Sequence, residues 1–312
     1  MTATATTIEL PLAGPGGEPV DLWRTIVSHG VADLPPGRVD EEQRMYETTL
    51  AIPGARPRAI LIADGGDRLA RVDVRGPRLG ERARARLVGR LRRILNLEED
   101  LSGFYAVAAR DPELAWVTRG AGRMLRTPTV FEAVVKTICT TNCAWSATRR
   151  MTSALVDHLG EKAAGGVGRA FPTAEAMAAA PLEFYRDVAR AGYRGAYLRG
   201  FADSVAEGRT DVESLGDAPV SELPDDEVER QLLALPGIGP YAAAHVMMLL
   251  GRHSRLILDS WTRPKYARLT GGETVPDADI ERRFRRYGEY AGLAFWLYLT
   301  RDWVADEDSA EP

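Results

Sequence analysis

The order of apolar and polar residues divides the chain into two parts. In residues 1–115, short runs rich in β-branched residues are bounded by Gly, Pro and Asp, which is typical of β-strands. Two longer stretches carry apolar residues on one side and predict helices. Strands that follow one another directly favour an antiparallel sheet over repeated β-α-β units. We predict strands at 6–12, 44–52, 58–64 and 68–74, and helices at 21–28 and 80–95.

From about residue 116 the apolar positions recur with helical spacing. Several of these stretches begin at Ser, Thr or Asp, or just after Pro, as helices commonly do. The only strand-like run is 255–258. The sequence therefore predicts an α+β fold with a small antiparallel-sheet domain (1–115), an all-α domain (116–305) and a disordered acidic tail (306–312). The predicted helices are 129–155, 173–180, 182–191, 196–207, 225–235, 241–251, 261–269, 277–288 and 291–303.

Composition limits the classes of protein that fit. The N-terminus lacks the pattern of a signal peptide, and the longest apolar stretch, 242–250, is too short to cross a bilayer. We expect a cytoplasmic protein. The formal net charge of −4 does not indicate a nucleic-acid binder, although arginine is concentrated in 75–93 and 263–286. Cys139 and Cys143 are too few for a four-cysteine site, so neither an iron–sulfur cluster nor a metal is expected.

A Leu-Pro-Gly-Ile-Gly-Pro tract at 235–240 separates two predicted helices. Gly237 and Gly239 permit positive φ, and Pro240 suits the first turn of the second helix. Such a turn directs free backbone N–H groups and the positive end of a helix dipole to one place, which is an anion site suited to a DNA phosphate. A plain corner between two helices is the alternative for this tract alone.

Asp259 follows Gly239 by twenty residues, after one helix and a short apolar run. An aspartate before a helix is by itself most often an N-cap. Hairpin and aspartate together resemble the helix-hairpin-helix DNA glycosylase family, whose pattern is L-P-G-[VI]-G, a helix, and an aspartate about twenty residues on. The resemblance implies that Asp259 is catalytic. A carboxylate there stabilises the positive charge that develops on the sugar and activates the attacking water.

The resemblance extends over about residues 116–303, toward the branch that contains 8-oxoguanine and AlkA-type alkyladenine glycosylases. These enzymes extrude a base from double-stranded DNA and must fill the gap. The resemblance gives Asn142 the role of filling that gap, Tyr193 that of a wedge, and Arg194 that of a polar reader of the opposite base. Lys265 is read as a phosphate or surface contact.

Two departures from the family pattern bear on the subtype. Relatives that also nick the strand carry lysine two places after the second hairpin glycine, where this chain has Tyr241. The glutamine that reads 8-oxoguanine is matched by Phe295. Tyr241, Trp261 and Phe295, with Trp296 as a further candidate, are therefore predicted to form an aromatic pocket for an electron-poor alkylated base.

We accordingly predict a monomeric, monofunctional DNA glycosylase of base excision repair that releases an alkylated purine without AP-lyase activity. No cofactor is expected, and a monovalent cation at the hairpin is left open. Three alternatives remain: an 8-oxoguanine glycosylase, a catalytically inactive lesion-binding protein, and a helix-hairpin-helix module that tethers a partner to DNA.

Overall fold

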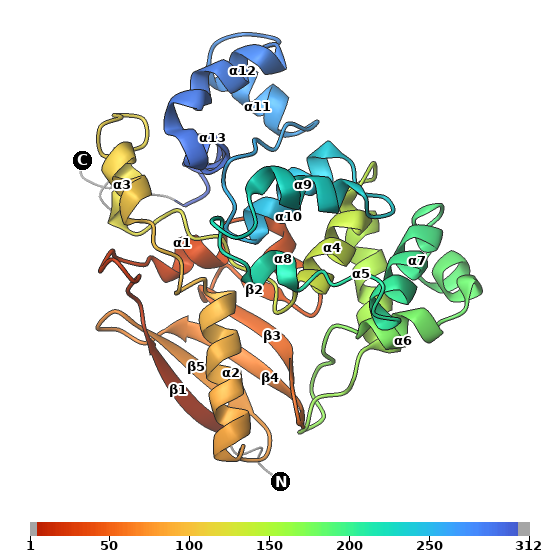
Figure 1. The fold of residues 1–312 in the computed structure, drawn as a ribbon. Helices are drawn as coiled ribbons and strands as arrows, with labels where there is room; N and C mark the ends of the chain where they lie inside the picture. Colours follow the sequence, from red (N-terminus) through yellow and green to blue (C-terminus); the bar gives the residue numbers. More distant parts are fainter. Residues whose placement is uncertain (1–4, 305–312) are drawn as a thin grey trace.

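The computed structural model describes residues 5–304, so the predicted acidic tail at 306–312 lies outside the described residues. A twisted sheet with one long helix across it forms one end of the molecule, and short helices form the rest (Figure 1). The five antiparallel strands have the order β1-β5-β4-β3-β2. They are β1 (Ala5–Pro11), β2 (Arg38–Asp40), β3 (Met45–Ile52), β4 (Ala55–Asp64) and β5 (Leu69–Arg75).

The alternation of apolar residues along the strands produces one buried face. Ile60 and Ile62 of β4 and Val72 of β5 lie on that face. Helix α2 (Glu81–Ile94) packs against it through Leu87 and Leu91, which lie one turn apart. The four predicted strands and both N-terminal helices are confirmed. The short strand β2 was not predicted, because three residues carry too little periodicity.

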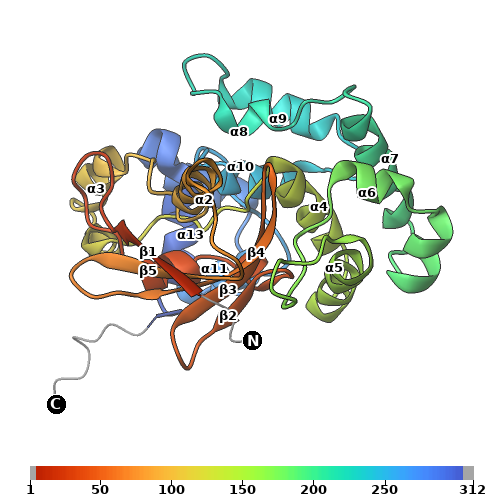
Figure 2. The same ribbon diagram turned by 90° about the horizontal axis from the view of Figure 1, so that it is seen from below.

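The helical part contains the hairpin that joins α9 to α10 (Figures 1 and 2). None of the helices in residues 5–304 has the length and apolar character needed to span a membrane. The elements outside the sheet are α1 (Leu22–Ile26), η1 (Gly30–Asp33), α3 (Ser102–Ala108), η2 (Ala115–Arg119), α4 (Val130–Thr140), α5 (Trp145–Leu159), α6 (Ala174–Ala179), η3 (Phe184–Val188), α7 (Arg194–Ala206), α8 (Ser214–Asp217), α9 (Asp225–Leu233), α10 (Pro240–Leu249), α11 (Thr262–Leu269), α12 (Asp277–Phe284), η4 (Arg285–Tyr290) and α13 (Ala291–Thr300).

The boundary predicted at residue 115 does not coincide with the packing. Phe104 of α3 and Leu114 and Val117 around η2 belong to the same buried cluster as Phe284 of α12. The segment from about residue 101 therefore packs with the C-terminal helices. Contacts between residues so far apart in sequence leave no local signal.

Two further predictions differ from the structure. The helix predicted at 129–155 is broken into α4 and α5 at Asn142, whose φ is +46°. The run 255–258 forms no strand with any described residue. It lies against the start of α13, where the N–H of Gly292 donates to the carbonyl of His253 over 2.7 Å. A Cβ at Gly292 would collide with the carbonyl of Arg255.

Candidate active site

The hairpin joins α9 to α10, and its two glycines have different roles. Gly237 has φ +79°, and a Cβ there would lie 2.8 Å from Cδ2 of Tyr197. Both the positive φ at residue 237 and the closeness of the Tyr197 ring therefore require glycine at this position. Gly239 has φ −103°, which any residue can adopt, and a Cβ there would have no atom within 4 Å. Gly239 therefore does not use the positive φ that glycine permits, and its exposed backbone leaves room for a ligand.

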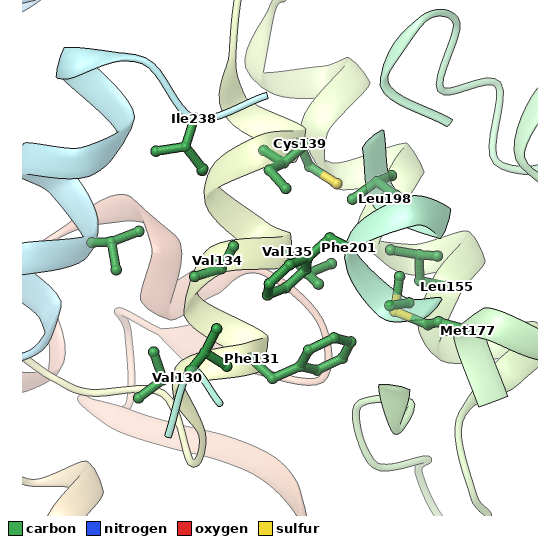
Figure 3. Close-up of a cluster of buried hydrophobic side chains, with 14 of the residues drawn as sticks. Val130, Phe131, Val134, Val135, Cys139, Leu155, Met177, Leu198, Phe201 and Ile238 are labelled. Atoms are coloured by element: carbon green, nitrogen blue, oxygen red, sulfur yellow. The ribbon is translucent and has the colours of Figure 1, made fainter. Parts of the chain in front are cut away.

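Ile238 fixes the hairpin to the helical core. Its side chain is buried and points toward α4, where Val134 and Cys139 lie in the same cluster (Figure 3). This contact leaves Gly239 and Pro240 exposed at the start of α10. No side chain caps the first turn of α10. Its N–H groups are therefore available to an anion, except at Pro240, which has none.

Asp259 is half-buried and caps α11. One carboxylate oxygen, Oδ1, accepts hydrogen bonds from the N–H groups of Trp261 (2.8 Å) and Thr262 (2.6 Å). The N–H of Asp259 in turn donates to Oγ1 of Thr262 over 2.8 Å. The other oxygen, Oδ2, makes no hydrogen bond or ion pair with the described residues. The capping role is thus observed, and it holds the carboxylate in one orientation with Oδ2 unbonded.

Tyr241 is in the first turn of α10, and its side chain reaches the end of α4. Its hydroxyl is 3.4 Å from Oγ1 of Thr140. Burial raises the pKa of the Tyr241 phenol, and the nearby carboxylate of Asp259 raises it further, against the lowering effect of the Thr140 hydrogen bond. The phenol is therefore protonated at neutral pH. Ring contacts run from Tyr241 through His245 and Trp296 to Trp261, whose N–H donates to Asp259, and this chain of contacts joins the hairpin helix to the aspartate.

An aromatic cluster continues from Asp259. The rings of Trp261 and Trp296 are 5.6 Å apart, and that of Trp303 lies 5.7 Å from Trp261. Trp261 is 38% exposed, so one side of the cluster faces solvent. Trp296 is held by a 2.8 Å hydrogen bond from its Nε1 to the carbonyl of Ser28. Trp261 thus lies in an aromatic cluster beside Asp259, and its role in a base pocket stays a prediction.

Phe295 does not join this cluster, which corrects the prediction for it. Its side chain has no exposed surface, and its ring lies 5.2 Å from that of Phe284 and 6.0 Å from that of Tyr266. Adjacent residues of a helix point in different directions, so Trp296 faces Trp261 while Phe295 enters the core. Helix α13 is buried on all sides, and its periodicity therefore could not separate the two.

Asn142 and Tyr193, predicted to act at the flipped base, lie together. Nδ2 of Asn142 is 3.5 Å from the Tyr193 hydroxyl, and Tyr193 is 54% exposed. The Tyr193 ring lies 5.9 Å from that of Tyr197, which covers Gly237 of the hairpin. Three segments far apart in the sequence therefore meet on one exposed surface.

Arg194 does not face solvent as a reader of a base. It is 7% exposed, and its Nε and Nη2 both donate to the carbonyl of Thr141, with a distance of 2.9 Å for Nε. Its guanidinium also lies over the Tyr193 ring, 4.6 Å from the centroid. Arg194 thus supports the turn that carries Asn142 and the ring of Tyr193.

Lys265 and several arginines near it form ion pairs within the protein, which the sequence did not predict. Nζ of Lys265 bonds both carboxylate oxygens of Asp302, at 2.7 and 2.9 Å. A phosphate would have to compete with Asp302 for this ammonium. Four of the six arginines of 263–286 are paired in the same way; the pairs are Arg263–Asp277, Arg282–Asp279, Arg283–Glu113 and Arg286–Asp111.

His245 was not singled out from the sequence. It lies one turn after Tyr241, with ring centroids 5.9 Å apart, and it is only 6% exposed. Neither ring nitrogen makes a hydrogen bond. Burial lowers the pKa of His245 to about 4, and burial together with the charge of His245 lowers that of neighbouring His29 to about 3. Both imidazoles are therefore neutral in the folded protein.

The neutral His245 predicts an acid-sensitive fold. Its folded pKa is below the unfolded value of 6.5, so its contribution is complete above pH 6.5 and is lost as pH falls toward 4. Between pH 7 and pH 5 the native protein should lose about 2 kcal/mol more unfolding free energy than His245→Phe, which keeps an aromatic ring without a titrating group. Urea unfolding at both pH values measures this, and equal losses in the two proteins would contradict it.

No protein-bound metal site is evident in residues 5–304, where no group of three or more His, Cys, Asp or Glu side chains could hold an ion. Both cysteines are free thiols. Burial raises the pKa of the Cys139 thiol to about 12, and Sγ of Cys143 donates to the Cys139 carbonyl. The expectations of no cofactor and of a possible cation at the hairpin stay predictions.

The antiparallel sheet, the helical domain, the hairpin and its aspartate together give the chain the fold of DNA glycosylases that combine these parts. It is similar over 96% of its length to a 3-methyladenine DNA glycosylase from Archaeoglobus fulgidus, with a TM-score of 0.72, 20% identity and 99% of that chain covered. It is also similar to an 8-oxoguanine glycosylase/lyase from Clostridium acetobutylicum, with a TM-score of 0.71 and 18% identity over 96% and 98% of the two chains. The same Clostridium enzyme in complex with double-stranded DNA gives a TM-score of 0.71 and 19% identity over 97% and 98%. No protein-family model and no curated protein matches the sequence.

Proposed function

We propose that this protein is a DNA glycosylase, which hydrolyses the bond between a damaged base and its sugar in double-stranded DNA. The observation that carries the proposal is the Asp259 carboxylate, held at the start of α11 by two backbone hydrogen bonds with Oδ2 unbonded. The hairpin supplies exposed N–H groups for a backbone phosphate. Asn142 and Tyr193 lie on the hairpin's surface, where they are suited to fill the gap left by an extruded base.

Asp259 has two roles in the proposed reaction, one toward the sugar and one toward the attacking water. As the glycosidic bond breaks, positive charge develops on the sugar, and Oδ2 stabilises it. The same carboxylate orients or deprotonates the attacking water. Because Oδ1 is fixed by Trp261 and Thr262, Oδ2 needs no reorientation when the substrate arrives.

The base that the site favours is an alkylated, electron-poor purine. Ring contacts join Tyr241, His245, Trp296 and Trp261, and Trp261 also donates its N–H to Asp259. Aromatic faces attract a cationic base. The alternative, an 8-oxoguanine enzyme, would read an oxidised edge with a polar side chain. The matched residue, Phe295, is apolar and belongs to the core.

Identification of the released bases tests the function. Purified protein is incubated with methylated and with oxidised duplex DNA, and free bases are identified by mass spectrometry. Release of alkylated purines with multiple turnovers supports the proposal. Release of 8-oxoguanine alone would overturn the lesion class. Binding without release would leave a lesion-binding protein.

We also expect no strand nicking. An AP lyase attacks the sugar with an amine and passes through a Schiff base. Tyr241 stands where strand-nicking relatives have lysine, and a phenol cannot form an imine. Lys265 is engaged by Asp302, and Lys136 is buried with Glu132 at 2.7 Å.

The product should therefore be an intact strand with an abasic site, cut only by heat or alkali. Borohydride added during turnover should trap no covalent protein–DNA adduct. An adduct that disappears in Lys265→Ala would place the nucleophile at Lys265 and contradict the expectation.

A further inference from the structure

A pocket of about 640 Å³ lies between α2, the segment 96–99 and α8, and the proposed activity does not use it. Its volume is within the range of small-ligand sites. Four arginines contribute to its lining: Arg86, Arg90 and Arg93 from α2, and Arg126 from the segment before α4. The sequence showed this arginine concentration, but α2 alone gave no reason to expect a pocket.

One face of α2 is built around this pocket. Arg86, Arg90 and Arg93 are spaced four and three residues apart, and Gly89 precedes Arg93 by four, so all of them share one side of the helix. Glycine inside a helix costs about 0.5–1 kcal/mol relative to alanine. A Cβ at Gly89 would meet no atom within 4 Å, so no close contact requires glycine there. What the missing side chain provides is space in the pocket.

Arg126 carries a half-buried guanidinium that has no hydrogen-bonding partner among the described residues, although the charge of nearby Glu99 acts on it. Its Nε is buried without a hydrogen bond, and no hydrogen bond or ion pair of its side chain is found within residues 5–304. The nearby carboxylate of Glu99 is already bonded to Nδ2 of Asn96 and Nε2 of His253. A buried N–H without a hydrogen-bonding partner is unfavourable, and an anion in the pocket would give the Arg126 guanidinium a partner that the protein does not supply.

The acidic residues that line the pocket offset only part of its positive charge. Glu98 pairs with Arg92, which does not line the pocket, and Asp217 pairs with Arg93. Glu99 acts on Arg126 without a hydrogen bond to it. Glu213, which faces Arg90 at longer range, accepts hydrogen bonds from the N–H groups that begin α4. Arg86 donates to the carbonyl of Pro53 over 2.7 Å, which leaves its charge unpaired. Three guanidinium groups, those of Arg86, Arg90 and Arg126, therefore face the pocket without an ion pair.

We propose that this pocket binds a small free anion that carries phosphate groups, with Arg90 and Arg126 as its principal ligands. Arginine suits phosphate because its planar fork donates two parallel hydrogen bonds. The position favours a free ligand over the DNA held by the hairpin. Arg126 abuts Gly251, directly beyond the C-terminal end of α10, whereas the hairpin forms the N-terminal end. Ten helical residues separate the two by about 15 Å.

Calorimetry with inorganic pyrophosphate tests the site. The native protein should bind one equivalent. Arg90→Gln and Arg126→Gln should each raise Kd at least about tenfold, which corresponds to the loss of a charge-assisted hydrogen bond. Gly89→Leu should do the same by filling the pocket without a change of charge. Arg84→Gln, which faces a different pocket on α2, is the matched control and should bind as the native protein does.

Arg90→Gln and Gly89→Leu change partly or wholly exposed positions, so they keep the test valid if Arg126→Gln fails to fold. Absence of pyrophosphate binding by the native protein would overturn the proposal. So would binding by Arg90→Gln and Gly89→Leu that is as tight as that of the native protein.

A second experiment titrates the protein with undamaged duplex DNA. Competition between duplex and pyrophosphate, with weaker duplex binding by Arg90→Gln, would assign the pocket to DNA phosphates and overturn the free-ligand assignment. Base release plays no part in either experiment, so failure here is distinct from failure of the proposed function.

Discussion

Asp259→Asn is expected to bind damaged duplex DNA as the native protein does and to lose about 10³-fold in the single-turnover rate of base release. The amide oxygen can keep the hydrogen bonds from Trp261 and Thr262, so α11 stays capped. The amide nitrogen that replaces the second carboxylate oxygen is neutral, and it neither stabilises the sugar cation nor accepts a proton from water.

The matched control is Asp277→Asn, the same chemical change in an exposed carboxylate paired with Arg263. Its rate should stay within about twofold of the native rate, as expected for an exposed ion pair. Thermal unfolding confirms that both variants are folded. An unchanged rate in Asp259→Asn would assign the chemistry to another residue.

Gly237→Ala is expected to weaken duplex binding by about tenfold to a hundredfold. Alanine at φ +79° is strained by about 1–2 kcal/mol, and its Cβ would press against the Tyr197 ring. Displacement of the hairpin then misdirects the N–H groups that hold a phosphate, each worth about 1.5–3 kcal/mol when the acceptor is charged.

Gly239→Ala separates backbone strain from ligand contact. Gly239 has an extended φ and an open Cβ position, so its replacement should leave the melting temperature unchanged. Gly237→Ala should lower it. Fluorescence anisotropy with labelled duplex and thermal unfolding measure the two effects. Equal melting temperatures for the two variants would contradict the assigned role of Gly237.

The parts of the site that local sequence determines could be predicted. The positions of the hairpin and of Asp259 depend on a turn, on the length of one helix and on a helix cap. Each of these features is determined by a short continuous segment of the sequence. The strands were readable because each alternates over its own length. The rest depends on partners distant in sequence: the Asp302 that engages Lys265 lies 37 residues away, and the Thr141 carbonyl that binds Arg194 lies 53 away.

In a helix that is buried on all sides, the sequence pattern does not show which way each side chain points. All ten residues of α13 are buried, so no polar face indicated that Phe295 enters the core while Trp296 faces Trp261. The α4–α5 break at Asn142 was missed for a related reason, because apolar residues continue across it. The pocket beside α2 is formed by elements that only the tertiary structure brings together.

The capping role of Asp259, together with the catalytic role proposed for it, constrains which substitutions the chain can tolerate. Alanine at 259 would remove both the reacting oxygen and the cap of α11, and loss of a cap costs about 1 kcal/mol. Asparagine, serine or threonine would remove the chemistry and still offer an oxygen to the N–H groups of Trp261 and Thr262. Related proteins that have lost catalysis but still bind DNA should therefore carry asparagine, serine or threonine at this position. Aspartate at this position would then distinguish active proteins from inactive ones that keep the helix cap.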